Sequence, residues 1–217
     1  MRTGRCRKVH VEPAERDLIA LAATGDSQAF ERLIAPYEKR LYALCLRICA
    51  NREDALDCAQ EVMLRIWRSI PKYRFQASLS TWCYRIATNT CLDLLRKQKF
   101  RPSVSLDALT EDGFSPANET EDKSDPQAYS EADARKRALQ EGIASLPLDM
   151  RAALVLRDIQ GFSYEEIADI LTLPIGTVKS RINRSREKLR QSIMEKSGNL
   201  ELFGNASVQS YEGRRQA

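Results

Sequence analysis

Apolar side chains recur every three or four positions along most of this 217-residue chain, and no segment alternates with period two for long enough to suggest a sheet. This spacing places the apolar side chains on one face of an α-helix. Four helical segments are predicted in the first hundred residues, ending at Gly25, near Ile48, at Pro71 and near Lys99. The sequence therefore predicts an all-α protein.

The acidic residues are concentrated between two helical regions. The whole chain has 34 Lys and Arg residues against 30 Asp and Glu, but residues 102–127 hold seven acidic residues and one lysine, with no apolar stripe. We therefore expect two small helical domains, 14–101 and 131–196, joined by a flexible acidic linker, 102–130. A flexible N-terminal arm (1–13) and a disordered C-terminal tail (197–217) are expected at the ends.

The residues needed for common enzymatic sites are missing. The chain has one histidine and 9 glycines, with neither a nucleophile-elbow nor a P-loop pattern. Its 6 cysteines lack the paired CxxC spacing of a zinc site, and Cys45 and Cys49 fit an apolar helical pattern as small core residues. We predict no catalytic residues, no metal and no cofactor. No apolar run is long enough to span a bilayer, so a cytoplasmic protein is expected.

Ser163–Arg190 has the pattern of a helix, a short turn and a second helix. Ile167 and Leu171 are expected to face inward in the first helix. The second helix opens at Pro174–Thr177 and has a predicted buried stripe of Val178, Ile182 and Leu189. Lys179–Arg190 contains six basic residues and one acidic residue, which suits a polyanion. A helix-turn-helix that inserts its second helix into the major groove of DNA is predicted.

A second cationic segment lies in the first domain. Residues 61–101 contain nine basic and two acidic residues. Aromatic residues lie among these charges: Tyr73, Phe75, Trp82 and Tyr84. Rings can stack on unpaired bases while cations follow the backbone, so this mixture favours single-stranded DNA.

Three segments resemble one protein family. Ser145–Arg190 closely resembles the promoter-binding C-terminal domain of bacterial sigma factors of the extracytoplasmic-function group. DALDCAQEVMLRIW (Asp54–Trp67) resembles the family's polymerase-binding helix, and STWCYRIATNTCLDLLRK (Ser80–Lys97) resembles its promoter-melting helix. Family members often have phenylalanine in place of Met63 and glycine in place of Phe75.

The resemblance implies three sets of binding residues. Contacts to core RNA polymerase are expected from Asp57, Gln60, Glu61, Leu64 and Trp67. Contacts to the minus-ten element are expected from Tyr73, Arg74, Phe75, Gln76, Trp82, Arg85, Asn89 and Arg96. Contacts to the minus-thirty-five element are expected from Thr177, Lys179, Ser180, Arg181, Asn183, Arg184 and Arg186. The implied partners are core RNA polymerase, promoter DNA and an anti-sigma factor, often membrane-anchored, with no small-molecule substrate.

Other functions fit parts of the sequence. A stand-alone repressor or activator would use the helix-turn-helix and leave the first half unexplained. A thiol-based redox sensor would use the cysteines. A nuclease with a metal on Glu53, Asp54 and Asp57 has carboxylates at suitable spacing but no partner ligands elsewhere.

Overall fold

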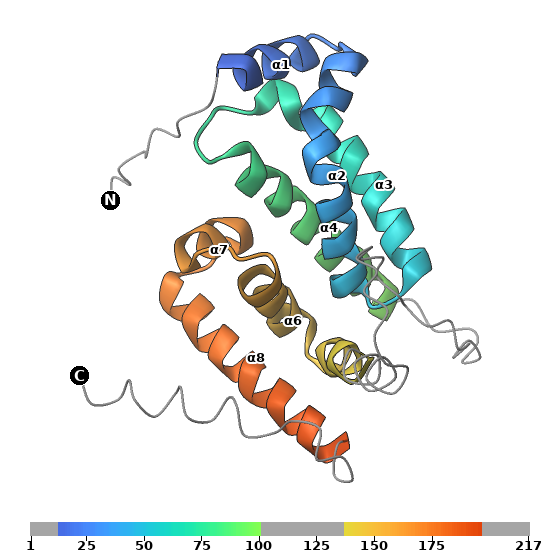
Figure 1. Cartoon of the computed structure of the whole chain (residues 1–217), viewed down its shortest axis with the longest axis vertical. Coiled ribbons are helices and arrows are strands. Elements are labelled where there is room, and N and C mark those ends of the chain that lie inside the picture. The colour runs from blue at the N-terminus through green and yellow to red at the C-terminus, as the bar shows by residue number, and fades with distance from the viewer. Residues whose placement is uncertain (1–12, 101–136, 197–217) are drawn as a thin grey trace, which may run out of the picture.

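The computed structural model describes residues 13–100 and 137–196, and within these ranges the chain forms helices and no strand (Figure 1). The all-α prediction is confirmed. Most of the predicted arm, together with the whole predicted linker and tail, lies outside the described residues.

Four α-helices and one short 3-10 turn build the first domain. They are α1 (Pro13–Ala23), α2 (Ser27–Cys49), α3 (Arg52–Ser69), the 3-10 turn η1 (Ile70–Lys72) and α4 (Leu79–Phe100). The side chain of Asp26 caps α2 by accepting hydrogen bonds from the backbone N–H groups of Gln28 and Ala29. Asn51 caps α3 in the same way through the N–H of Asp54. These caps come directly after the predicted helix ends at Gly25 and near Ile48.

The second domain contains a helix over residues 137–145, then α6 (Leu148–Leu154), η2 (Val155–Ile159), α7 (Tyr164–Leu171) and α8 (Ile175–Lys196). η2 is a single π-helical turn, in which the N–H of Gln160 donates to the carbonyl of Val155. The core side chain at the end of α7 differs from the prediction. Ile170 is fully buried together with Ile167, three residues before it, whereas Leu171 is only half-buried.

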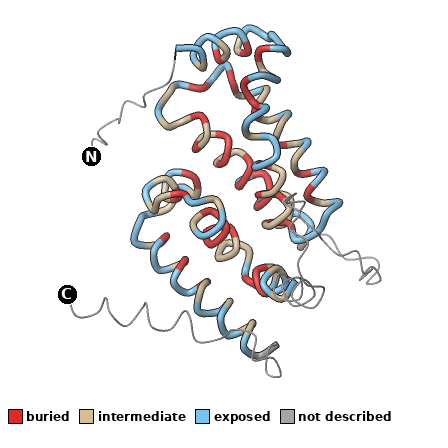
Figure 2. The backbone as a smooth tube through the Cα atoms, viewed as in Figure 1, coloured by how far each residue is buried: buried red, intermediate tan, exposed pale blue. Residues whose placement is uncertain are grey.

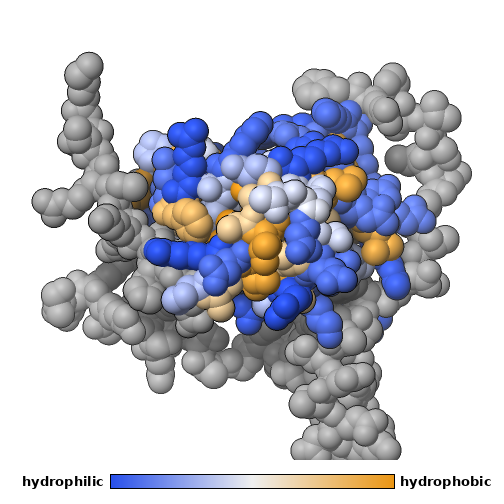
Figure 3. Space-filling model, turned by 90° about the horizontal axis from the view of Figure 1, so that it is seen from above, coloured by the Kyte–Doolittle hydropathy of each residue, from blue (hydrophilic) through white to orange (hydrophobic). Residues whose placement is uncertain are grey.

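Buried side chains form one continuous core across both domains (Figure 2). α4 packs against α7, and α2 reaches α6 (Figure 1). α3 and α8 lie on opposite outer sides of the molecule. The face at the α1 end is mainly hydrophilic, with hydrophobic side chains gathered near its centre (Figure 3). The two domains are thus in direct contact, which the sequence did not predict.

Candidate DNA and polymerase interfaces

The turn between α7 and α8 fixes the angle at which α8 leaves the domain. Ser163 and Glu166 form a reciprocal capping box at the start of α7. At the other end Thr172 adopts a left-handed conformation, with φ of 54°, and its N–H and that of Leu173 both donate to the carbonyl of Ala168. This is the position at which glycine is the usual residue, so the turn geometry is retained without it.

α8 buries one face and exposes the other. Val178 and Ile182 are fully buried, as predicted, and Leu189 is half-buried. The opposite face exposes four of the predicted minus-thirty-five residues: Lys179, Ser180, Asn183 and Arg184. Because this face begins in the first turns of the helix, it has the geometry of a recognition surface for the major groove.

Two of the other three predicted minus-thirty-five residues, Arg181 and Arg186, form intramolecular ion pairs. Arg181 is half-buried and lies 4.0 Å from a carboxylate oxygen of Asp149. Arg186 is half-buried and forms a bidentate ion pair with Asp158, in which Nε donates to Oδ2 at 2.9 Å. Thr177 is half-buried. The guanidinium groups of Arg181 and Arg186 are thus engaged with Asp149 and Asp158.

The loop before α4 is folded around the ring of Tyr73. This ring is only 8% exposed, and its hydroxyl donates to the carbonyl of Ala77 at 2.7 Å. Phe75 packs on it with 4.9 Å between ring centroids and has a left-handed φ of 56°. Tyr73 therefore supports the loop from inside, and the exposed side chains are those of Arg74 and Gln76.

The remaining predicted minus-ten residues lie along one face of α4. Trp82, Arg85, Asn89 and Arg96 follow one another at spacings of three, four and seven residues, which places them on that face. Asn89 and Arg96 are exposed, whereas Trp82 and Arg85 are half-buried. Trp82 also contacts the Tyr73 ring, with 5.1 Å between centroids. The structure thus brings the loop and this face of α4 together.

The predicted polymerase-binding residues lie on α3. Asp57, Gln60 and Leu64 are exposed, and Leu64 is 47% exposed. Glu61 pairs with Arg65 at 2.7 Å, and the hydrogen bond from Arg65 lowers the pKa of Glu61. Trp67 is half-buried, with its ring edge-on to Phe30.

Leu56 extends this surface and was missed by the sequence analysis. It is 45% exposed and lies two helical turns before Leu64 on the same face of α3. In the sequence, Leu56 could have been recognised as an apolar residue that lies eight positions before Leu64 and does not belong to the buried stripe of α3.

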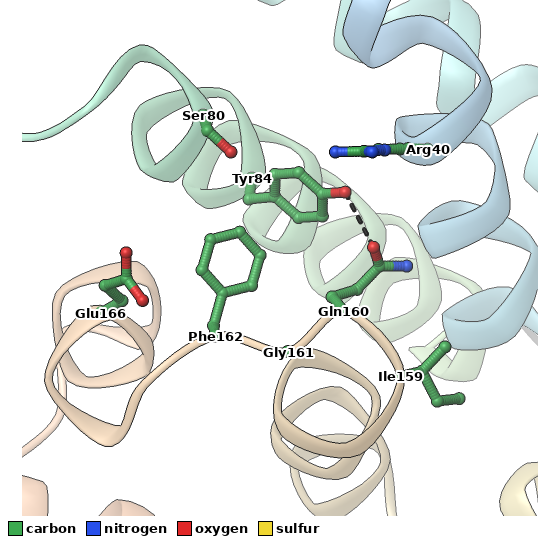
Figure 4. A pocket seen from close by; sticks show the side chains of 8 residues that line it. All are labelled: Arg40, Ser80, Tyr84, Ile159, Gln160, Gly161, Phe162 and Glu166. Carbon is green, nitrogen blue, oxygen red and sulfur yellow. Dashed lines mark hydrogen bonds between the residues drawn. The ribbon is translucent and has the colours of Figure 1, made fainter.

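Several side chains join the two domains. The ring of Tyr84 on α4 packs edge-on to Phe162, with 4.6 Å between centroids, and its hydroxyl donates to Oε1 of Gln160 at 2.8 Å (Figure 4). Arg40, Ser80 and Glu166 line the open cleft beside this contact. Burial raises the pKa of Tyr84, so its hydroxyl remains a donor at neutral pH.

Charged contacts cross the same junction. Arg96 on α4 pairs with Asp149 on α6 at 3.2 Å. Arg151 donates from Nη1 to the carbonyl of Ile48 at 2.7 Å. Asp149 therefore contacts one predicted residue of the minus-ten set, Arg96, and one of the minus-thirty-five set, Arg181.

Cys45 and Cys49 are buried, as predicted. Cys58, Cys83 and Cys91 are buried as well, and three of these five cysteines form a cluster. The Sγ atoms of Cys45, Cys58 and Cys91 all lie within 4.8 Å of one another. Hydrogen bonds with Cys58 and Cys91 lower the pKa of Cys45, whereas hydrogen bonds with its thiol neighbours and burial raise the pKa of Cys91. Sequence spacing does not reveal this group because its members come from three different helices. Cys6 lies outside the described residues.

Comparison with protein families identifies both domains. Residues 33–101 match Sigma-70 region 2, and residues 136–189 match Sigma-70, region 4.

Curated relatives match over most of the chain. The RNA polymerase sigma-H factor of Pseudomonas aeruginosa is 33% identical over 181 residues, covering 82% of this chain and 93% of the relative. The ECF RNA polymerase sigma factor SigE of Mycolicibacterium smegmatis is 39% identical over 194 residues, covering 86% and 72%.

Solved structures agree in fold. CnrH in complex with the cytosolic domain of CnrY matches with a TM-score of 0.57 and 26% identity, over 82% of this chain and 96% of that one. RpoE in complex with the anti-sigma factor NepR from Bartonella quintana matches with a TM-score of 0.59 and 23% identity, over 76% and 96%.

The chain belongs to the sigma-70 family, in its ECF group. It is a transcription initiation factor that directs core RNA polymerase to promoters, and it is not an enzyme. Among the described helices, none combines the length and hydropathy needed to cross a membrane.

Proposed function

We propose that the three functions of this sigma factor are divided among three exposed helical faces. The outer face of α3 binds core RNA polymerase, the face of α4 with the preceding loop binds the minus-ten element, and the outer face of α8 reads the minus-thirty-five element. The observation that carries this proposal is the exposure of all three faces on helices whose other sides form the core. We assign the first two faces to a domain of residues 14–101 and the third to a domain of residues 131–196.

The α8 face offers both kinds of DNA contact. Asn183 and Arg184 are exposed in the third turn of α8 and can reach base edges in the major groove. The Nζ of Lys179 lies 5.6 Å from the ring centroid of Tyr164, the first residue of α7. From that position it suits a phosphate contact, which fixes the register of the helix on the duplex.

The α4 face and its loop suit capture of an unpaired base. Arg74, Gln76 and Asn89 supply exposed polar groups, and the half-buried rings of Phe75 and Trp82 lie beside them. Extruding a base costs a few kcal/mol of lost pairing and stacking, which stacking and hydrogen bonds in a pocket offset. This binding drives strand opening without any covalent step.

The two DNA-binding faces must separate before they can act together. A promoter spacer of about 16 to 18 base pairs covers roughly 60 Å, whereas here the domains touch through Tyr84 and Gln160. The 29-residue segment 102–130 can span up to about 95 Å when extended. Opening also releases Arg96 on α4 from Asp149 on α6. We propose that binding of polymerase favours the open arrangement.

An anti-sigma factor is the expected antagonist. The resemblance to the family supports it, and the cleft between the domains offers a place where a partner could hold them together. We place the action of the protein in the cytoplasm, since its promoter and polymerase are there. Co-purification from the native host tests this partner directly.

A gel-shift assay with and without core polymerase tests the proposed division of function. We expect the free protein to bind duplex promoter weakly and the complex with polymerase to bind it tightly and specifically. Tight, specific binding by the free protein would instead favour a stand-alone repressor or activator.

A further inference from the structure

Three thiols from three different helices meet at one point in the core of the first domain. Cys45 lies on α2, Cys58 on α3 and Cys91 on α4, and all three are fully buried. Their Sγ atoms all lie within 4.8 Å of one another, and those of Cys58 and Cys91 are 3.0 Å apart. A tetrahedral zinc ion, with Zn–S bonds of about 2.3 Å, places its sulfur ligands about 3.8 Å apart. The cluster therefore has nearly the dimensions of a thiolate site.

A fourth thiol lies beside this cluster. Cys49 is one helical turn after Cys45 on α2, is buried, and interacts with the thiols of Cys58 and Cys91. We propose that Cys45, Cys49, Cys58 and Cys91 bind a single zinc ion that cross-links α2, α3 and α4. Four soft sulfur ligands in a closed site favour zinc among the common divalent ions. An iron–sulfur cluster would need more separation, because iron and sulfide lie between its cysteine ligands.

Arg151 supplies a counter-charge next to the proposed site. Four thiols that bind Zn²⁺ release four protons, which leaves a net charge of −2 in the core. The guanidinium of Arg151 interacts electrostatically with Cys49 and donates to the carbonyl of Ile48, the residue before it. Its buried Nε–H has no hydrogen-bond partner among the described residues. Metal-bound ligands are commonly supported by such donors.

The site would couple folding of the first domain to metal. α3 and α4 carry the proposed polymerase and minus-ten faces, and the ion would fix both helices on α2. Because the three central thiols are fully buried, the ion is acquired during folding rather than through an open channel. Arg151 comes from the second domain, so the charge of the loaded site would also strengthen the contact between the domains.

Zinc analysis of the intact chain tests the proposal. The full-length protein is purified under reducing conditions, without a metal-affinity resin, from cells grown with zinc. We expect about one zinc ion per chain by mass spectrometry of the metal. A chain that contains no zinc, and takes up none when refolded with Zn²⁺ and reductant, would overturn the proposal. So would a metal-free chain isolated with a disulfide between Cys58 and Cys91, which would support redox sensing.

Variants place the ion at this cluster. Cys91→Ala should lose the zinc, whereas Cys83→Ala should keep it, because Cys83 is equally buried on the same helix but outside the cluster. Loss of zinc in both folded variants, or in neither, contradicts the assignment. If Cys91→Ala does not fold, the wild-type chain refolded with Co²⁺ decides the question. A thiolate-to-cobalt charge-transfer band supports the site, and its absence overturns it.

Discussion

The hydroxyl of Tyr84 donates a hydrogen bond at 2.8 Å to Oε1 of Gln160, 76 residues away, and this bond joins α4 of the first domain to the segment that precedes α7 in the second. The same tyrosine packs edge-on to Phe162. One side chain on the helix that carries the proposed minus-ten face therefore also holds the DNA-reading domain in place. The contact that keeps the domains together lies next to the surface they must expose.

Removal of this hydroxyl should loosen the junction without unfolding either domain. Tyr84→Phe keeps the ring contact but loses a hydrogen bond of about 1 kcal/mol. We expect amide exchange around residues 159–163 to accelerate about fivefold, as measured by hydrogen–deuterium exchange. Tyr42→Phe, on a half-buried tyrosine of α2, is the matched control and should leave this segment unchanged. Equal exchange in both variants would show that the bond does not hold the junction.

Binding of core polymerase by the outer face of α3 should depend on Leu64. This side chain is 47% exposed, so Leu64→Arg should leave thermal stability nearly unchanged. Placing a charge in an apolar contact should weaken binding to core polymerase about tenfold or more. Leu21→Arg is the control, because Leu21 is 50% exposed on α1. Equal loss of polymerase affinity in the two variants, measured by fluorescence anisotropy, would remove α3 as the specific interface.

Promoter reading should depend on Arg184. Its exposed side chain lies on the outer face of α8, and Arg184→Ala should cost about 1–3 kcal/mol in binding to the minus-thirty-five element. Polymerase affinity should be unaffected. Arg190→Ala is the control variant. Arg190 lies about two helical turns after Arg184, and its guanidinium pairs with Glu187 at 2.9 Å. A loss of affinity that is the same on specific and scrambled duplexes would identify Arg184 as a phosphate contact instead.

The turn of the helix-turn-helix should be stabilised by glycine. Thr172 has a φ of 54°, a conformation that costs a residue with a Cβ about 1–2 kcal/mol. Glycine removes this strain but increases the entropy of the unfolded chain. Thr172→Gly should therefore raise the free energy of unfolding by about 0.5–1 kcal/mol in urea denaturation. Thr172→Ala, which retains Cβ, should raise the free energy of unfolding much less. Equal increases in the two variants would contradict the presence of backbone strain at Thr172.

Local patterns predicted the helices well, because caps and apolar periodicity act over a few residues. Asp26 and Asn51 cap helices that begin just after the predicted helix ends at Gly25 and near Ile48, and Val178 and Ile182 are buried as expected. The same patterns predicted a short turn before the helix that opens at Pro174, and Thr172 lies in this turn. Its left-handed backbone is needed to join α7 to α8, whichever residue occupies the position.

Relationships between distant segments could not be predicted in this way. Cys58 and Cys91 are 33 residues apart on different helices, so no spacing rule connects them. The pairing of Asp149 with Arg96 depends on how the domains pack. Tyr73 was expected to face DNA, but the loop folds around its ring, because a buried aromatic side chain stabilises the turn.

Run-off transcription with purified core polymerase tests the central claim most directly, that separate faces of one chain bind polymerase and read the promoter. The wild-type chain should redirect initiation to a defined set of promoters from a library. Leu64→Arg should lose initiation at all of these promoters, because it no longer binds polymerase. Arg184→Ala should retain polymerase binding and lose initiation in proportion to each promoter's dependence on the minus-thirty-five element. If both variants fail at the same step, or the wild-type chain does not change where synthesis starts, the account is contradicted.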